Sequence, residues 1–295
     1  MSKNKKAYTD EQLKRKVKRM RGLISVFAPS MTSKAKNRAG SEHFLETDEG
    51  RVRVLAYNIA NPEKLPLFIN IHGGGFVIGS PEMDDPFMLN IAEKANVKIL
   101  NVDYSLSPEH QFPKALNECY AVVKYAKEHS EEFGIDPERI AVGGQSAGGN
   151  LTAAICLMEH EKNLLGIKCA ILDYPPLDIY TDATEKPRPK GALPVFVSNI
   201  FDPSYLNDKE SRKNPLVSPV FADVEQLRTF PPTLVITASR DSLCAEAEKF
   251  RDNLIAAGVD VTHKRFEAKH GFNLNPGPES DESWEMIIAH LKKWV

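Results

Sequence analysis

Hydrophobic positions along this chain follow two different periods that alternate from residue 51 onward. Short runs rich in β-branched and apolar residues predict strands, and apolar positions at helical spacing between them predict helices. The predicted strands cover residues 51–59, 67–71, 98–103, 140–143, 168–173, 233–238 and 261–267. The predicted helices cover residues 86–94, 113–129, 146–159, 245–257 and 283–294. This alternation, with continuously apolar strands, predicts an α/β fold built on a mostly parallel, doubly wound sheet.

Two segments depart from the alternation. In the first, apolar residues recur on one helical face, at Leu13, Val17, Met20, Ile24 and Phe27. In the second, residues 180–219, six prolines flank a short apolar and aromatic piece, and an insertion of this length is usually functional. We therefore expect residues 1–45 to form an N-terminal cap segment and residues 180–219 a cap insertion. Residues 46–179 and 220–295 would form the two parts of the core.

The N-terminal segment predicts a basic amphipathic helix. Thr9 and Gln12 have the spacing of a capping box, and Asp10 and Glu11 suit a first helical turn. Its cations are Lys3, Lys5, Lys6, Lys14, Arg15, Lys16, Lys18, Arg19 and Arg21. Such a helix could lie on an anionic membrane, or pack its apolar stripe on the protein as a lid. We favour packing on the protein, because a lid over an active site also needs a helix with one apolar face.

Composition narrows the classes of function. The net charge of −2 provides no basic field for nucleic acid, so we expect no nucleic-acid partner. The 4 cysteines are scattered without metal-ligand spacing, which favours buried free thiols and no metal site. No apolar run is long enough to span a membrane, and the N-terminus lacks a signal peptide's apolar region. We therefore expect a cytoplasmic protein without stable membrane insertion.

A nucleophile elbow is indicated at residues 144–148, which read Gly-Gln-Ser-Ala-Gly. A G-x-S-x-G pattern arises by chance in about one chain in ten of this length. The predicted strand before it and helix after it make chance less plausible. In that context Ser146 would sit in a strained turn at a helix N-terminus, where negative charge is favoured.

A serine nucleophile also needs an oxyanion site, an acid and a base. The strand at 67–71 ends in His72-Gly-Gly-Gly-Phe76, whose glycines free backbone N–H groups to point at one spot, although a tight turn would have the same residues. The candidate acid is Asp241, which follows the strand at 233–238. Ligands gather at the carboxyl ends of strands in open α/β sheets. The candidate base is His270, which follows the strand at 261–267.

Each of these assignments has alternatives. Asp241 could instead cap a helix, and Asp173 and Asp178 are rival acids. His270 could be a loop histidine with its hydrogen bonds satisfied. The order Ser146, Asp241, His270 is nevertheless the one expected of an α/β-hydrolase.

With these residues in place, the chain resembles the hormone-sensitive-lipase-like family of α/β-hydrolase esterases. The matching stretches are HGGGFVIGS at 72–80, DYSLSPEHQFP at 103–113, GQSAGGN at 144–150, PPTLVITASRD at 231–241 and HGF at 270–272. The resemblance implies Ser146 as nucleophile, His270 as base and Asp241 as acid, with no cofactor. It also implies oxyanion donors at the N–H groups of Gly73, Gly74 and Ala147, a structural His72, and a small helical cap made with the N-terminal segment.

Four positions depart from the family's usual pattern without removing any of these groups. Gln145 stands where an acidic residue is common, Ser105 and Ser107 replace Arg and Ala, and Ala245 replaces an acid. These changes bear on the hydrogen bonds around the site and on substrate range.

The resulting hypothesis is a serine carboxylesterase whose partner is a small-molecule ester. The apolar residues expected at its substrate site are Phe76, Val77, Phe196, Ile200 and Phe201. A cap built from short pieces suggests a confined pocket and short acyl chains. The alternatives are a deacetylase of acetylated small molecules or sugars, and a non-catalytic small-molecule-binding homologue. A homodimer through the strand at 261–267 is an expectation from the resemblance alone.

Overall fold

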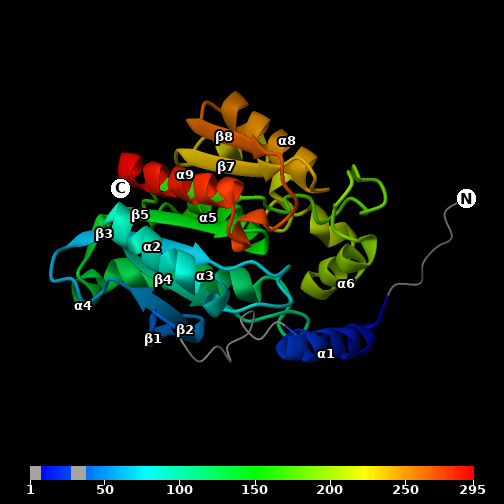
Figure 1. The fold of residues 1–295 in the computed structure, drawn as a ribbon, viewed down its shortest axis with the longest axis horizontal. Helices are drawn as coiled ribbons and strands as arrows, with labels where there is room; N and C mark the ends of the chain where they lie inside the picture. Colours follow the sequence, from blue (N-terminus) through cyan, green and yellow to red (C-terminus); the bar gives the residue numbers. More distant parts are fainter. Residues whose placement is uncertain (1–7, 28–37) are drawn as a thin grey trace, which may run out of the picture.

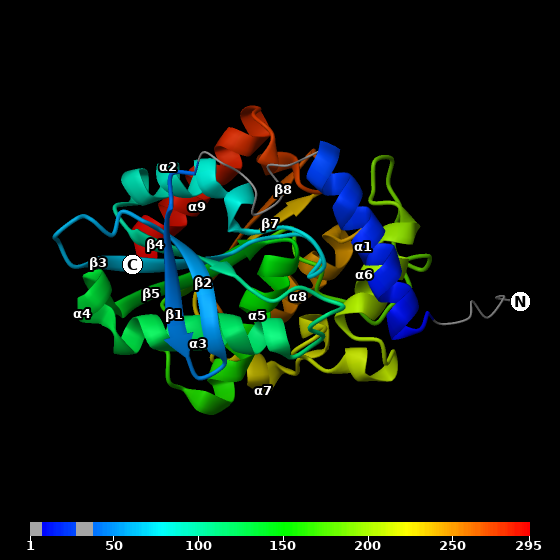
Figure 2. The same ribbon diagram turned by 90° about the horizontal axis from the view of Figure 1, so that it is seen from below.

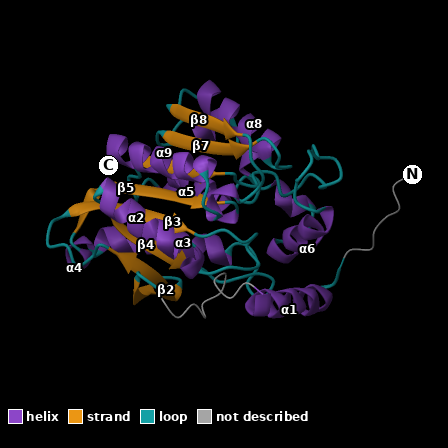
Figure 3. Ribbon diagram, in the orientation of Figure 1, coloured by secondary structure: helices purple, strands orange, loops and turns teal. Residues whose placement is uncertain are grey.

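The computed structural model of the chain describes residues 8–27 and 38–295. In this part of the chain eight strands form one sheet in the order β1-β2-β4-β3-β5-β6-β7-β8. Figure 3 shows the strands in orange, between helices in purple. β2 is antiparallel to β1 and β4, and the remaining neighbours are parallel. The strands are β1 (Ser41–Thr47), β2 (Gly50–Tyr57), β3 (Leu65–Ile71), β4 (Lys98–Asp103), β5 (Ile135–Gln145), β6 (Cys169–Asp173), β7 (Thr233–Ala238) and β8 (Val261–Phe266). The predicted α/β fold with a mostly parallel sheet is confirmed.

Helices cover both faces of the sheet (Figure 1). They are α1 (Asp10–Phe27), α2 (Asp85–Ala95), α3 (Lys114–Glu128), α4 (Ser130–Phe133), α5 (Ala147–Lys162), α6 (Val195–Tyr205), α7 (Val224–Leu227), α8 (Cys244–Ala256) and α9 (Pro278–Trp294). Apolar residues of α3, α5 and α8 form one core cluster, and those of α2 and α9 form the other. Side chains alternate along a strand, so Leu67 and Ile69 of β3 enter the first cluster while Phe68 enters the second.

Two helices, α1 and α6, lie side by side beyond the carboxyl ends of the parallel strands (Figures 1 and 2). The expected capping box is present on α1, since Thr9 and Gln12 exchange backbone-to-side-chain hydrogen bonds. Leu13 and Val17 are fully buried, so the apolar stripe packs on the protein in this structure. Lys3, Lys5 and Lys6, and the side chain of Phe27, lie outside the described residues.

The structure differs from the sequence-based prediction at several element bounds. β1 was not predicted, because its sequence SEHFLET contains only one fully buried position, Leu45, and this strand spans the boundary that we placed between residues 45 and 46. α6, which includes Pro203, was predicted only as an apolar piece. β5 begins five residues earlier than predicted, at Ile135, where it pairs with Leu65.

Candidate active site

Ser146 occupies the turn between β5, which ends at Gln145, and α5, which begins at Ala147. Its φ of +51° is a backbone conformation that non-glycine residues rarely adopt. A Cβ at position 148 would lie 1.8 Å from the carbonyl oxygen of Ile71 on the neighbouring strand. Gly148 is therefore required for α5 to start this close to β3, and the turn presents Ser146 at the helix N-terminus.

Ser146, His270 and Asp241 meet at the carboxyl ends of their strands. His270 Nε2 lies 2.9 Å from Ser146 Oγ, and His270 Nδ1 lies 2.6 Å from Asp241 Oδ2. Asp241 is 2% exposed, and its Oδ1 accepts the N–H of Leu243 at 3.1 Å. This bond and the contact with His270 hold the carboxylate in one orientation, so it can fix the tautomer of the imidazole.

The two rival acids are engaged elsewhere in this structure. Asp173 is buried and accepts a hydrogen bond from the Asn273 amide, and burial raises its pKa to about 8. Asp178 accepts the backbone N–H groups of Tyr180 and Thr181 through one carboxylate oxygen. Among the described hydrogen bonds of His270, only Asp241 supplies a carboxylate.

The glycine loop after β3 lies against the serine turn. A Cβ on Gly73 would be 3.5 Å from the Cβ of Ser146, and Gly73 and Gly74 line the same cavity as the serine. Ala147 is the first residue of α5, where backbone N–H groups have no partner within the helix. His72 is fully buried and stacks on Tyr104, whose hydroxyl donates to the His72 carbonyl.

A cavity of about 460 Å³ opens in front of Ser146. Its lining combines the serine, His270 and the glycine loop with side chains from α1, α6 and the 174–193 segment. Of the five apolar residues expected there, Phe76, Phe196 and Phe201 line it. Val77 is instead fully buried, and its neighbour Ile78 faces the cavity. Ile200 is likewise outside the described lining, whereas Val197 on α6 is part of it.

The N-terminal helix reaches this cavity through Met20, which is one of the lining residues. The next residue, Arg21, holds the helix in place. Its guanidinium donates to the carbonyls of Val77 at 2.8 Å and Ser107 at 2.6 Å, and pairs with Glu109 at 2.9 Å. α1 is therefore attached directly to the loop that follows the glycines.

Three charged residues of the lining were missed by the sequence reasoning: Asp84, Lys186 and Asp202. Asp84 accepts a hydrogen bond from the Asn70 amide at 2.8 Å, and burial raises its pKa to about 7. Lys186 pairs with Glu246 at 2.6 Å. A signal was available for Asp202, which is the only charged residue in the α6 sequence VFVSNIFDPSY.

Two of the four positions that depart from the family pattern, Ser105 and Ser107, form local hydrogen bonds. Ser105 donates its hydroxyl to Glu118 at 2.8 Å, and Ser107 donates its hydroxyl to the His110 carbonyl at 2.9 Å. Gln145 is buried, and its side-chain oxygen has no hydrogen-bond partner among the described residues.

The cysteines and the metal-binding residue types show no special arrangement. Cys119, Cys156 and Cys169 are buried free thiols, as expected, and Cys244 is a partly exposed one. Within the described ranges, no group of three or more His, Cys, Asp or Glu residues is placed to hold a metal ion. No helix of residues 8–27 and 38–295 is long and apolar enough to cross a membrane.

Comparison with known sequences gives consistent matches. A sequence profile of the alpha/beta hydrolase fold matches residues 68–274. An arylesterase of Saccharolobus solfataricus is 31% identical over 229 residues, which is 77% of this chain and 74% of that protein. The carboxylic ester hydrolase LipN of Mycobacterium tuberculosis is 34% identical over 76% of this chain, a match that spans 61% of LipN.

Solved structures agree with these matches. A hyperthermophilic esterase from the archaeon Pyrobaculum calidifontis aligns with a TM-score of 0.82 and 28% identity, covering 96% of this chain and 94% of that one. A thermostable esterase from Pseudomonas putida aligns with a TM-score of 0.85 and 27% identity, covering 94% of this chain and 90% of that one.

Proposed function

Because this chain belongs to the hormone-sensitive-lipase-like family of α/β-hydrolase carboxylesterases, we propose that it hydrolyses small esters by a serine mechanism with an acyl-enzyme intermediate. The observation that carries this proposal is the unbroken chain of contacts from Ser146 through His270 to Asp241. Its partner would be a small-molecule ester, and neither a metal nor an organic cofactor takes part in the proposed steps.

In the proposed first step Ser146 Oγ attacks the ester carbonyl carbon while His270 Nε2 removes the serine proton. The imidazolium that forms is stabilised by the buried carboxylate of Asp241, and it then protonates the departing alcohol. In the second step water attacks the acyl-enzyme, again with His270 as base, and the carboxylic acid leaves.

Negative charge develops on the carbonyl oxygen in both steps. We assign its stabilisation to the backbone N–H groups of Gly73, Gly74 and Ala147. The closeness of Gly73 to Ser146 and the position of Ala147 at the start of α5 support this assignment. Losing one such donor typically lowers the rate about 100- to 1000-fold.

We further propose a preference for short acyl chains. The cavity of about 460 Å³ is large enough for a small ester, and α1 and α6 both contribute to its walls through Met20, Val197 and Phe201. The packing of α1 beside α6 supports the proposed cap made of residues 1–45 and 180–219. The homodimer through β8, which lies at the edge of the sheet, stays a prediction.

The test is hydrolysis of p-nitrophenyl esters from acetate to palmitate, with Ser146→Ala as the matched control. We expect rates that peak between acetate and hexanoate and vanish in the variant. A peak at long chains would refute the short-acyl preference. Substantial hydrolysis by clean Ser146→Ala would refute the serine mechanism. A deacetylase would instead favour acetylated sugars or alcohols over aryl acetates, and a receptor would fail to react with a fluorophosphonate probe.

A further inference from the structure

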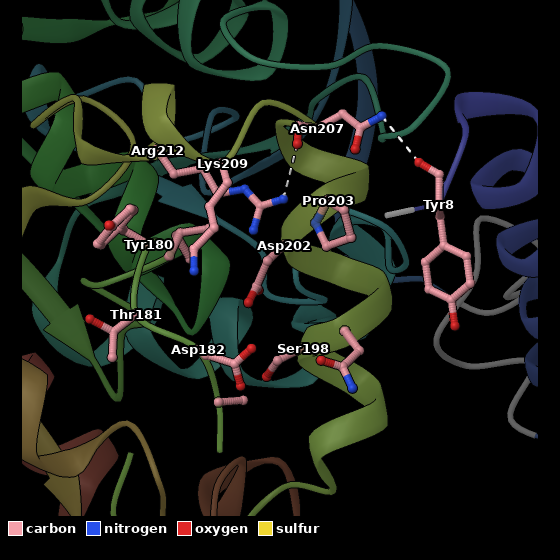
Figure 4. Close-up of a pocket in the computed structure, with 13 residues that line it drawn as sticks. Tyr8, Tyr180, Thr181, Asp182, Ser198, Asp202, Pro203, Asn207, Lys209 and Arg212 are labelled. Atoms are coloured by element: carbon pink, nitrogen blue, oxygen red, sulfur yellow. Dashed lines mark hydrogen bonds between the residues drawn. The ribbon is translucent and has the colours of Figure 1, made fainter. Parts of the chain in front are cut away.

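A second cavity, of about 430 Å³, adjoins the cavity in front of Ser146. Figure 4 shows the residues that line this second cavity. The two share Ile179, Ser198 and Asp202 as lining residues. The rest of the second cavity is lined mainly by polar and charged residues, among them Tyr180, Asp182, Asn207, Lys209 and Arg212. A substrate that enters the largely apolar first cavity therefore meets a polar boundary on the α6 side.

Asp202 is the charged group at this boundary. Its side chain points from α6 into the same space as Ser198 and Asp182 (Figure 4). No hydrogen bond described among residues 8–27 and 38–295 ends on its carboxylate. The carboxylate oxygens of Asp202 are thus free to accept hydrogen bonds from a ligand.

The two cations that act electrostatically on Asp202, Lys186 and Arg212, form hydrogen bonds with other groups. Lys186 bonds to Glu246 and to the carbonyl of Asp178 at 2.6 Å each. Arg212 donates to the carbonyls of Leu206 and Asn207. Both cations act on Asp202 through space without forming an ion pair with it among the described contacts.

Burial dominates the electrostatics of this carboxyl. It raises the pKa of Asp202 to about 7, against the lowering effect of the positive charges on Lys186 and Arg212. At neutral pH the group is present in both forms. The ionised form accepts hydrogen bonds, and the neutral form can also donate one. A ligand hydroxyl can pair with either form, because it is both donor and acceptor.

We propose that Asp202 is a specificity-determining residue that binds a hydroxyl group of the substrate, so that the enzyme prefers hydroxyl-bearing esters to alkyl esters of equal length. This inference rests on the proposed esterase function and deepens it by naming the substrate class. A partly buried carboxyl left unpaired by an alkyl chain carries a desolvation penalty that a hydroxyl removes, which is the physical origin of the selectivity.

The test compares pairs of esters that differ by a hydroxyl in place of a methyl group. The alcohol series sets 2-hydroxyethyl, 4-hydroxybutyl and 6-hydroxyhexyl acetates against propyl, pentyl and heptyl acetates. The acyl series sets p-nitrophenyl ω-hydroxyalkanoates against the matching alkanoates. We expect the hydroxyl member to have a kcat/KM about 10- to 100-fold higher at the chain length that reaches Asp202, in one of the two series.

Variants assign the preference to the carboxyl. Asp202→Leu should remove the hydroxyl advantage, because kcat/KM for the alkyl member of each pair rises toward that of the hydroxyl member once no carboxyl is left unpaired. Asp202→Asn keeps a hydrogen-bonding group of the same shape and should retain part of the advantage, as should Ser198→Ala. Asp208→Leu applies the same substitution at an exposed site outside both cavities and should leave the advantage intact.

Three outcomes would overturn the inference alone, while alkyl esters are still hydrolysed. One is equal rates within every ester pair at every length, and another is a hydroxyl advantage that persists in Asp202→Leu and Asp202→Asn. The third is a higher kcat/KM above pH 7 for 6-aminohexyl acetate than for 6-hydroxyhexyl acetate, which would mean that Asp202 binds an ammonium group of the substrate. Failure to hydrolyse any ester would overturn the proposed function first.

Discussion

Gly75 offers a direct test of how the glycine loop and the cap helix α6 depend on each other. A Cβ at this position would lie 1.9 Å from Cδ2 and 2.4 Å from Cε2 of Phe201. Carbon atoms in contact normally stay about 3.5–4.0 Å apart, so Gly75→Ala forces the ring to retreat by roughly 1.5–2 Å. The backbone φ of +61° adds about 1 kcal/mol of strain for alanine.

The displaced ring is part of the cavity wall, and Gly75 directly follows the proposed donor Gly74. A misplacement of about 1 Å can lower a rate by about 100-fold, so we expect Gly75→Ala to lower kcat/KM for p-nitrophenyl acetate by about 10- to 100-fold. Phe201→Ala alone should cost only a few-fold. In the double variant no ring opposes the new Cβ, so kcat/KM should return close to that of Phe201→Ala.

The two single variants and the double variant form a double-mutant cycle, whose expected coupling energy between Gly75 and Phe201 is about 1–3 kcal/mol. Gly258→Ala is the matched control, because its φ is +86° and nothing lies within 4 Å of the added Cβ. It should therefore show the strain without the collision, as a small loss of stability and unchanged activity. Wild-type kcat/KM in Gly75→Ala, or losses that simply add in the double variant, would refute the reasoning.

Asp241→Asn should lower kcat by about 10,000-fold with little change in melting temperature, because a neutral amide favours the wrong tautomer of His270; a loss below tenfold would contradict the assignment. Asp173 has a folded-state pKa raised from 3.8 to about 8, so the folded protein retains a proton that the unfolded chain loses. Between those values this group should lower the stability by up to about 1.4 kcal/mol per pH unit, so denaturation at pH 5–8 should show a smaller pH slope in Asp173→Asn than in the wild type; an unchanged slope in Asp173→Asn would refute the idea. Arg21→Ala removes the contacts of α1 with Val77, Ser107 and Glu109, and should lower kcat/KM about tenfold while making residues 8–27 more sensitive to proteolysis; equal sensitivity would argue against the anchor.

Much of the core could be predicted from the local sequence. The alternation of apolar strands and helices predicted the parallel part of the sheet, because each period reports the backbone conformation of its own segment. The elbow around Ser146 was also readable, since a close strand-to-helix turn requires small residues such as Gly148. Strand β1 was not predicted, because an edge strand with a single buried residue, Leu45, has almost no periodic pattern of apolar residues.

The composition of the cavity was decided by the tertiary structure. Val77 and Ile78 are adjacent apolar residues, and only the path of the loop determines that Val77 is buried while Ile78 faces the cavity. Met20 and Asp202 come from segments far from Ser146 in sequence, and they share its cavity because α1 and α6 pack beside each other.

The sequence by itself therefore determined the fold class, the family and the residue types available for ester hydrolysis. The tertiary structure decided that Ser146 and His270, 124 residues apart, lie within hydrogen-bonding distance, and that the partly buried carboxyl of Asp202 borders their cavity. The physical reason is that periodicity and motifs describe which face of an element is apolar and how its chain turns. Which element then packs opposite that face depends on contacts between distant segments, and these do not leave a local pattern.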